Sequence, residues 1–199
     1  QDPLVFLSNR LLMSMRAVLT QKSACRICRG GAFAKVLSFG PTPLANAFLK
    51  QSEMRGAEQY FPLDAYLCRE CGLLQLLDVV SPEILFKDYV YVSSTSPVFV
   101  AHFEKFADEV QARFALHRKS FVIDIGSNDG ILLCPFKERG VRVLGIEPDK
   151  AIAQLAQKNG IETVSHFFNA EVAKKLRKKY GQADVITATN VFAHIDDIH

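Results

Sequence analysis

The chain has 199 residues, 49% of them hydrophobic, which is enough apolar material for one or two domains with real cores. The formal net charge of +3 is too small to indicate a nucleic-acid-binding surface. No apolar stretch reaches the roughly 18 residues that a membrane-spanning helix needs. Composition therefore argues against a nucleic-acid partner, a membrane partner and intrinsic disorder.

Residues 1–23 are interpreted as an N-terminal extension that precedes the fold. Their apolar run is interrupted by Asn9, Arg10 and Arg16. The segment also has neither the basic start nor the small-residue cleavage site of a secretory signal peptide. We therefore predict a cytoplasmic protein.

Two CxxC sequences place Cys25 and Cys28 in one pair and Cys68 and Cys71 in the other. Four thiolates can converge tetrahedrally on one ion, and zinc favours such a ligand set. Two disulfides, or a redox-active CxxC, are the alternatives. The first needs an oxidising compartment and the second normally occurs singly. Because four protein ligands leave no open position, we predict a structural zinc site. The fifth cysteine, Cys134, is interpreted as a buried apolar thiol.

Residues 24–80 are predicted to form the zinc-bound lobe, with short strands and turns, because apolar runs at 35–39 and 72–80 are separated by prolines. Residues 81–120 are predicted to be a helical linker that contacts substrate. Helical spacing is clearest at 98–116. There, five apolar side chains recur at steps of three or four and are expected to form a core stripe: Phe99, Phe103, Phe106, Val110 and Phe114.

Residues 121–199 alternate between strand and helix patterns, which is typical of an α/β domain with a parallel sheet covered on both faces. The alternation predicts strands at 121–125, 141–146, 161–164 and 184–189, with helices at about 129–139, 149–159 and 169–180. The fold class is therefore α/β and Rossmann-like. Because the chain stops just after the fourth strand, we expect this domain to be incomplete.

The first strand of this domain leads into an acidic, glycine-spaced turn at residues 126–130, called the glycine turn below. Gly126 and Gly130 let the backbone approach a ligand, and Glu147 ends the next strand, where a carboxylate can bind ribose hydroxyls. Asn128 replaces the second glycine of the dinucleotide fingerprint. With Asp124 close by, the turn suits a cationic ligand such as S-adenosylmethionine better than a pyrophosphate.

Six motifs, taken together and in order, resemble the S-adenosylmethionine-dependent sugar C-methyltransferases of deoxysugar biosynthesis. They are the two CxxC pairs, Tyr-Val-Tyr-Val-Ser-Ser at 89–94, Asp-Ile-Gly-Ser-Asn-Asp-Gly at 124–130, Gly-Ile-Glu-Pro at 145–148 and Asn-Val-Phe-Ala-His-Ile at 190–195. The resemblance covers the chain from about residue 24 to its end. It implies a zinc-binding lobe, a class I methyltransferase domain and a further C-terminal domain. It also implies methylation of a carbon next to the keto group of a nucleotide-linked 4-keto deoxysugar.

Carbon becomes a nucleophile only after a proton next to a carbonyl is removed, so this chemistry needs a base and a group that stabilises the enolate oxygen. His194 is the candidate for the base or for a proton-relay group. Tyr91 is the candidate for the group that stabilises the enolate oxygen, with Tyr89 as the alternative.

The predicted cofactor site contains Asn128, and Asp124, Gly126 and Gly130 shape its methionine end. Glu147 is placed at the ribose and Asn190 near the sulfonium.

Several other functions remain open at this point. An RNA methyltransferase with a zinc module predicts a basic, aromatic-lined face, which the small charge does not support. An NAD-dependent enzyme is disfavoured by Asn128. A methyltransferase of another small molecule, or a zinc-stabilised scaffold with an inactive methyltransferase-like half, fits the same motifs. We expect the 199-residue chain by itself to bind cofactor without turnover.

Overall fold

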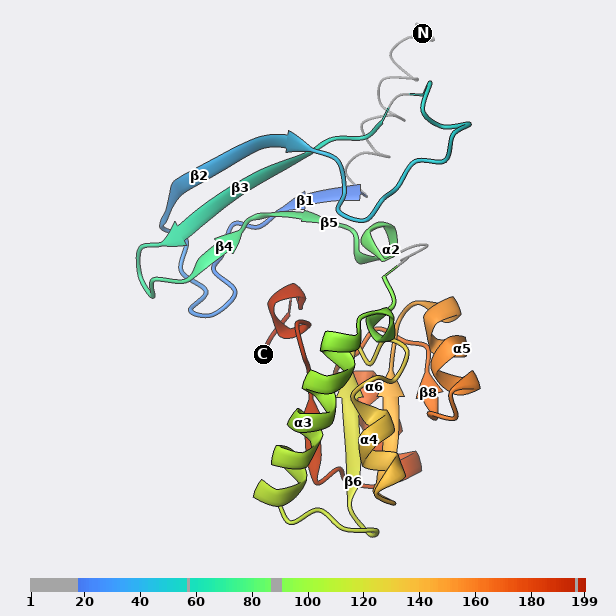
Figure 1. Cartoon of the computed structure of the whole chain (residues 1–199). Helices are drawn as coiled ribbons and strands as arrows, with labels where there is room; N and C mark the ends of the chain where they lie inside the picture. Colours follow the sequence, from blue (N-terminus) through green and yellow to red (C-terminus); the bar gives the residue numbers. More distant parts are fainter. Residues whose placement is uncertain (1–17, 57, 87–90, 196) are drawn as a thin grey trace, which may run out of the picture. The chain divides into compact units, whose positions relative to one another are not determined.

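The computed structural model describes residues 18–56, 58–86, 91–195 and 197–199 (Figure 1). The chain divides into two compact units, residues 1–87 with 196–199, and residues 88–195. Most of the predicted N-terminal extension lies outside the described residues. Among the residues that are described, no helix is both long and apolar enough to cross a membrane.

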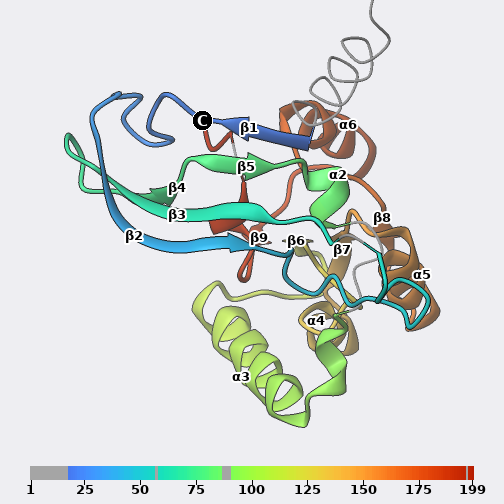
Figure 2. The ribbon, with the colours of Figure 1, turned by 90° about the horizontal axis from the view of Figure 1, so that it is seen from above.

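The first unit contains two antiparallel sheets. One has the strand order β2-β3-β4, formed by β2 (Phe33–Thr42), β3 (Phe61–Cys68) and β4 (Leu74–Leu76), and Figure 2 shows these strands side by side. In the other, β1 (Leu19–Gln21) pairs with β5 (Asp78–Val80), and the short helix α2 (Pro82–Leu85) follows. Part of the predicted extension is therefore a strand of this unit.

Strand β2 is longer than the apolar run that predicted it. It continues through Pro41, which pairs with Pro62 of β3, and ends at Thr42. The register shifts twice along this pair, between Lys35 and Leu37 and between Ser38 and Pro41. Such irregularities accommodate residues that cannot donate to the ladder, which explains how proline remains in a paired strand.

The second unit contains a parallel sheet with the strand order β8-β7-β6-β9. Its strands are β6 (Phe121–Ile125), β7 (Arg142–Ile146), β8 (Thr163–Val164) and β9 (Val185–Thr187). Its α-helices are α3 (Pro97–Arg113), α4 (Leu133–Glu138), α5 (Lys150–Lys158) and α6 (Ala170–Tyr180). The described residues of this unit also form two 3-10 turns, η1 (Ser93–Thr95) and η2 (Phe192–His194). The predicted α/β class is confirmed.

The sheet is covered on both faces because successive strand residues point to opposite sides. Val122 of β6 belongs to a cluster with the apolar faces of α3, α4 and α5. Its neighbours Phe121 and Ile123 belong to a second cluster with Leu176 of α6. Figure 1 shows α3 and α4 together in front of β6.

Two details differ from the sequence-based expectation. Helix α4 begins at Leu133 rather than near residue 129, because the glycine turn holds Asn128 and Gly130 at positive φ. The predicted phenylalanine stripe is buried only in its middle. Phe103 is 8% exposed, whereas Phe99 and Phe114 are 40% and 56% exposed. Phe99 lies in the first turn of α3 and Phe114 follows its last residue, so both are at the ends of the helix.

Candidate functional site

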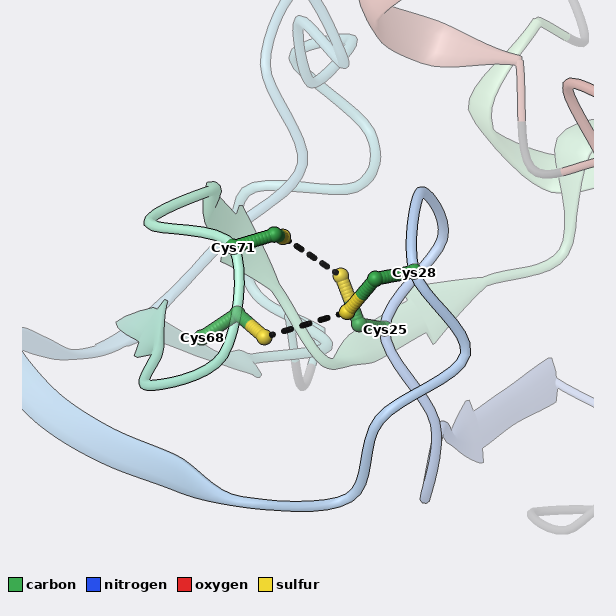
Figure 3. A group of neighbouring side chains, drawn as sticks. All are labelled: Cys25, Cys28, Cys68 and Cys71. Atoms are coloured by element: carbon green, nitrogen blue, oxygen red, sulfur yellow. Dashed lines mark hydrogen bonds between the residues drawn. The ribbon is translucent and has the colours of Figure 1, made fainter.

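The four cysteines of the CxxC pairs converge in the first unit (Figure 3). Their sulfur atoms all lie within 4.8 Å of one another, and those of Cys25 and Cys71, like those of Cys28 and Cys68, are 3.6 Å apart. Thiolates bound tetrahedrally at about 2.3 Å from one zinc ion are about 3.8 Å apart. A disulfide would bring two sulfurs to about 2.05 Å. The donor set and the spacing therefore fit one zinc ion.

Tight backbone turns aim these sulfurs. We call the turn that carries Cys25 and Cys28 the first knuckle and the turn that carries Cys68 and Cys71 the second. In the first knuckle the Arg29 N–H donates to the Cys25 carbonyl at 3.0 Å, and Arg29 adopts a positive φ. In the second, the Gly72 N–H donates to the Cys68 carbonyl at 2.9 Å. Cys25 and Cys68 are completely buried. The site is therefore built from two similar turns, one before β2 and one after β3.

Gln75 of β4 contacts the cluster and was not predicted from the sequence. Its Nε2 donates to the Cys25 sulfur at 3.2 Å, and its Oε1 accepts from the backbone N–H and the guanidinium of Arg26. Burial raises the pKa of Cys25, but hydrogen bonds from the Cys28 N–H and from Gln75 outweigh it and hold the pKa at about 6. The available signal was a polar amide within the apolar run 72–80, whose other polar residue is Asp78.

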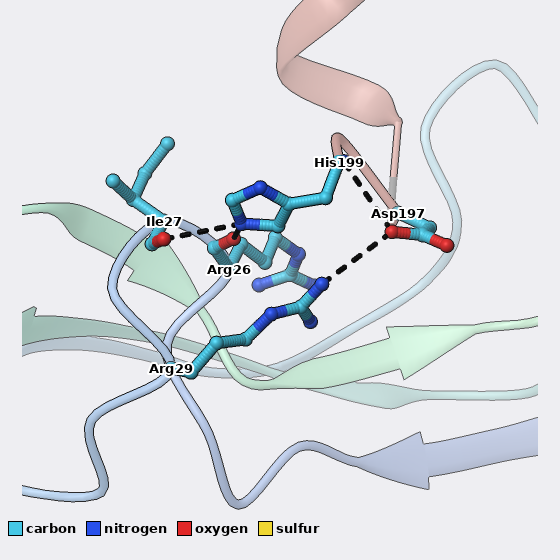
Figure 4. Close-up of polar contacts among 5 residues, drawn as sticks. All are labelled: Arg26, Ile27, Arg29, Asp197 and His199. Atoms are coloured by element: carbon cyan, nitrogen blue, oxygen red, sulfur yellow. Dashed lines mark hydrogen bonds and ion pairs between the residues drawn. The ribbon is translucent and has the colours of Figure 1, made fainter.

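The last residues of the chain also contact the first knuckle (Figure 4). The Nε2 atom of His199 lies 2.9 Å from the Arg26 carbonyl and 3.1 Å from the Ile27 carbonyl. The Arg29 guanidinium lies 3.6 Å from the Asp197 carboxylate. The sequence carried no pattern that assigned His199 a partner.

In the second unit, the candidate cofactor residues gather at the carboxyl edge of the parallel sheet. Asp124 is paired with Gly145 of β7 on one side and with Thr187 of β9 on the other. Asp124 is only 4% exposed, and its Oδ1 accepts a hydrogen bond from the Thr187 hydroxyl at 2.7 Å. Sequence reasoning missed Thr187, and its position at the end of the fourth strand was the only signal.

The glycine turn requires both of its glycines. Gly126 and Gly130 have φ values of +67° and +86°. A Cβ on Gly126 would overlap the Val191 side chain, and one on Gly130 would lie 2.8 Å from Ile161 Cγ1. Side chains are therefore excluded at both positions by conformation and by space.

Glu147 follows β7 and is 6% exposed. Its two carboxylate oxygens accept hydrogen bonds from the N–H groups of Asn128 and Asp149, each at 3.0 Å. Burial raises the pKa of Glu147, although these two bonds lower it. Burial also raises the pKa of Asp124 to about 7. The hydrogen bond from Thr187 lowers this pKa, and the negative charge of Glu147 raises it further. Two buried carboxyl groups favour a ligand that carries positive charge.

The glycine turn also has unused hydrogen-bonding capacity. In the described part of the chain, three buried side-chain atoms have no hydrogen-bond partner, and two of them, Ser127 Oγ and Asp129 Oδ1, belong to this turn. Buried polar atoms normally have hydrogen-bond partners, so these two oxygens are available to a ligand bound at the turn. Three features of this site therefore fit S-adenosylmethionine. They are the two buried carboxyl groups, the two glycines that leave room for a ligand, and the two oxygens of the turn that have no partner.

The other predicted residues are placed as follows. Asn128 uses both ends of its amide within the protein, since Oδ1 accepts from the Ser93 N–H at 2.9 Å and Nδ2 donates to the Tyr91 carbonyl at 3.0 Å. Tyr91 is 41% exposed, and Tyr89 lies outside the described residues. Asn190 and His194 are exposed and follow β9, with Asn190 at a φ of +56° and His194 in η2.

Residues 99–199, just over half of the chain, match the family model of a methyltransferase domain. The chain belongs to this methyltransferase domain family. A second family model, described as a zinc binding domain, matches residues 25–86. This segment contains all four clustered cysteines.

Among curated proteins, the chain is 36% identical over 185 residues to the C-methyltransferase NovU of Streptomyces niveus. The alignment covers 93% of this chain and 44% of NovU, so the chain spans less than half the length of that relative.

Similar solved structures include the plantazolicin methyltransferase BpumL with S-adenosylhomocysteine, at 19% identity, a TM-score of 0.36 and coverage of 48% of this chain and 36% of that one. The magnesium protoporphyrin IX methyltransferase ChlM of Synechocystis, with bound S-adenosylmethionine, is similar at 19% identity, a TM-score of 0.36 and 49% coverage of each chain.

Proposed function

We propose that this chain belongs to an S-adenosylmethionine-dependent C-methyltransferase that acts on a nucleotide-linked 4-keto deoxysugar. The observation that carries the proposal is the 36% identity to a C-methyltransferase over 93% of the chain, which includes both the cysteine cluster and the glycine turn. The substrate class comes from the sequence motifs that resemble the sugar C-methyltransferases.

The cofactor would occupy the carboxyl edge of the sheet. When bound, it supplies an electrophilic methyl group on a sulfonium. Asp124, Gly126 and Gly130 shape the methionine end, Glu147 holds the ribose and Asn190 lies near the sulfonium. The buried carboxyl groups and the orphaned oxygens of the glycine turn support this assignment, because both favour a cationic ligand with free N–H donors.

The protein must also make the sugar carbon nucleophilic. In the proposed reaction, His194 takes the proton from the carbon next to the keto group, and the electron pair moves onto the keto oxygen. The Tyr91 hydroxyl donates a hydrogen bond to that oxygen. Both side chains are exposed in the second unit, so a substrate can reach them from solvent.

The zinc ion would be held by Cys25, Cys28, Cys68 and Cys71. Four protein ligands leave no position for water or substrate, so the metal stabilises the first unit and takes no part in methyl transfer.

Calorimetric titration of the zinc-loaded chain with S-adenosylhomocysteine tests the proposal. We expect one saturable site on the wild-type chain and at least tenfold weaker binding for Gly126→Ala, whose new methyl group meets Val191. Gly181→Ala is the matched control. It has a similar φ of +93° but no atom within 4 Å of the added Cβ. Absence of binding by the wild-type chain would refute the proposal and favour a zinc-stabilised scaffold.

A further inference from the structure

Asn128 connects three separate parts of the second unit. Its side chain bonds the Ser93 N–H and the Tyr91 carbonyl, 35 and 37 residues away in sequence, at 2.9 and 3.0 Å. Its own N–H donates to Glu147 at the end of β7 at 3.0 Å. One residue of the glycine turn therefore meets the segment that contains Tyr91 and the carboxylate assigned to the cofactor ribose.

The backbone of Asn128 is in a conformation that glycine adopts more easily, with a φ of +50°. This is also the position where a dinucleotide fingerprint has glycine. An amide side chain here is explained by its two bonds, which glycine could not make. Asparagine and aspartate are the side chains that tolerate this conformation best.

The neighbouring residue strengthens the same connection. Asp129 accepts a hydrogen bond from the Ser94 N–H at 3.3 Å. Consecutive side chains of the glycine turn thus bind the consecutive N–H groups of Ser93 and Ser94, which begin η1. The first N–H groups of a helical turn have no partner within it, so these two depend on Asn128 and Asp129.

We infer that Asn128 is a positioning residue that clamps residues 91–95 onto the glycine turn, and is not itself a ligand of the cofactor. The clamp sets where the Tyr91 backbone lies relative to the methyl donor. The consequence for catalysis rests on the proposed function, because it takes Tyr91 as the group that meets the enolate oxygen. The clamp itself does not depend on that function.

Amide exchange measured by NMR on the zinc-loaded chain tests the clamp. In Asn128→Gly we expect the Ser93 amide to exchange at least about fivefold faster, because it loses its acceptor. Asn128→Asp keeps an acceptor at this place, so the Ser93 amide should stay protected. Asn46→Gly controls for the effect of placing glycine at a positive φ. Asn46 is exposed, has a φ of +61° and lies in the other unit, so the Ser93 amide should not respond.

Affinity for S-adenosylhomocysteine separates positioning from ligation. We expect Asn128→Gly to bind within threefold of wild type. An unchanged Ser93 exchange rate, or a loss of affinity beyond tenfold, would overturn the inference. If the wild-type chain binds no S-adenosylhomocysteine, the proposed function fails, while the exchange comparison still decides whether the clamp exists.

Turnover of a 4-keto deoxysugar nucleotide, measured on the full-length gene product, provides the functional readout. Asn128→Gly should lower kcat about tenfold and leave KM for S-adenosylmethionine within threefold. The same change made in a Tyr91→Phe background should have little further effect, because the group being positioned is already gone. A general structural role for Asn128 would lower kcat equally in both backgrounds and would contradict the inference.

Discussion

Asp124→Asn should stabilise the second unit at neutral and alkaline pH while it weakens cofactor binding. The folded protein holds the Asp124 carboxyl at a pKa of about 7, against an ordinary value of 3.8, because burial disfavours the charge. Since the folded-state pKa is the higher one, ionisation favours unfolding. The penalty is absent below about pH 4 and complete above about pH 7. It corresponds to roughly 4 kcal/mol at high pH.

Between pH 6 and pH 8 the same relation predicts that the wild type loses about 1.4 kcal/mol of unfolding free energy relative to Asp124→Asn. Urea unfolding followed by circular dichroism measures this difference, because α3, α4, α5 and α6 all lie in the second unit. Comparing the two proteins at each pH removes the contribution of zinc, which both share.

Glu104→Gln, an exposed carboxylate on α3, is the control and should follow the wild type at both pH values. Parallel pH dependences for wild type and Asp124→Asn would refute the reasoning. They would mean that the charged carboxylate carries no desolvation penalty in the folded unit.

Three further predictions follow from the same geometry. Affinity for S-adenosylmethionine should rise as pH increases through about 7, because ionised Asp124 attracts the cation, and calorimetry of Asp124→Asn should show this rise abolished. Gln75→Leu removes the donor to Cys25 and should release zinc to a competing chelator about 10- to 100-fold more readily, whereas Gln59→Leu, at an exposed site, should not. Phe103→Ala should cost about 3 kcal/mol in urea unfolding and Phe114→Ala less than about 0.5 kcal/mol, and equal costs would contradict the observed burial.

Local features of this protein could be predicted from sequence because they depend on neighbouring residues. The apolar run 121–125 forms β6 as expected, and alternation of strands and helices specifies the parallel sheet. Gly126 and Gly130 mark a turn whose backbone excludes side chains. Two short CxxC knuckles similarly specify a four-sulfur cluster, since each pair is positioned by its own turn.

Partners distant in sequence were decided only by the tertiary structure. Thr187 bonds Asp124 across 63 residues, Gln75 bonds Cys25 across 50, and the Asn128 amide reaches Tyr91 across 37. Burial along α3 likewise depends on which other elements pack against each of its side chains. Phe103 belongs to an apolar cluster with residues of α4 and β6 and is buried, whereas Phe114 is exposed. A sequence pattern reports which side chains could form such bonds. Only packing brings donor and acceptor within about 3 Å, and that distance determines whether the hydrogen bond forms.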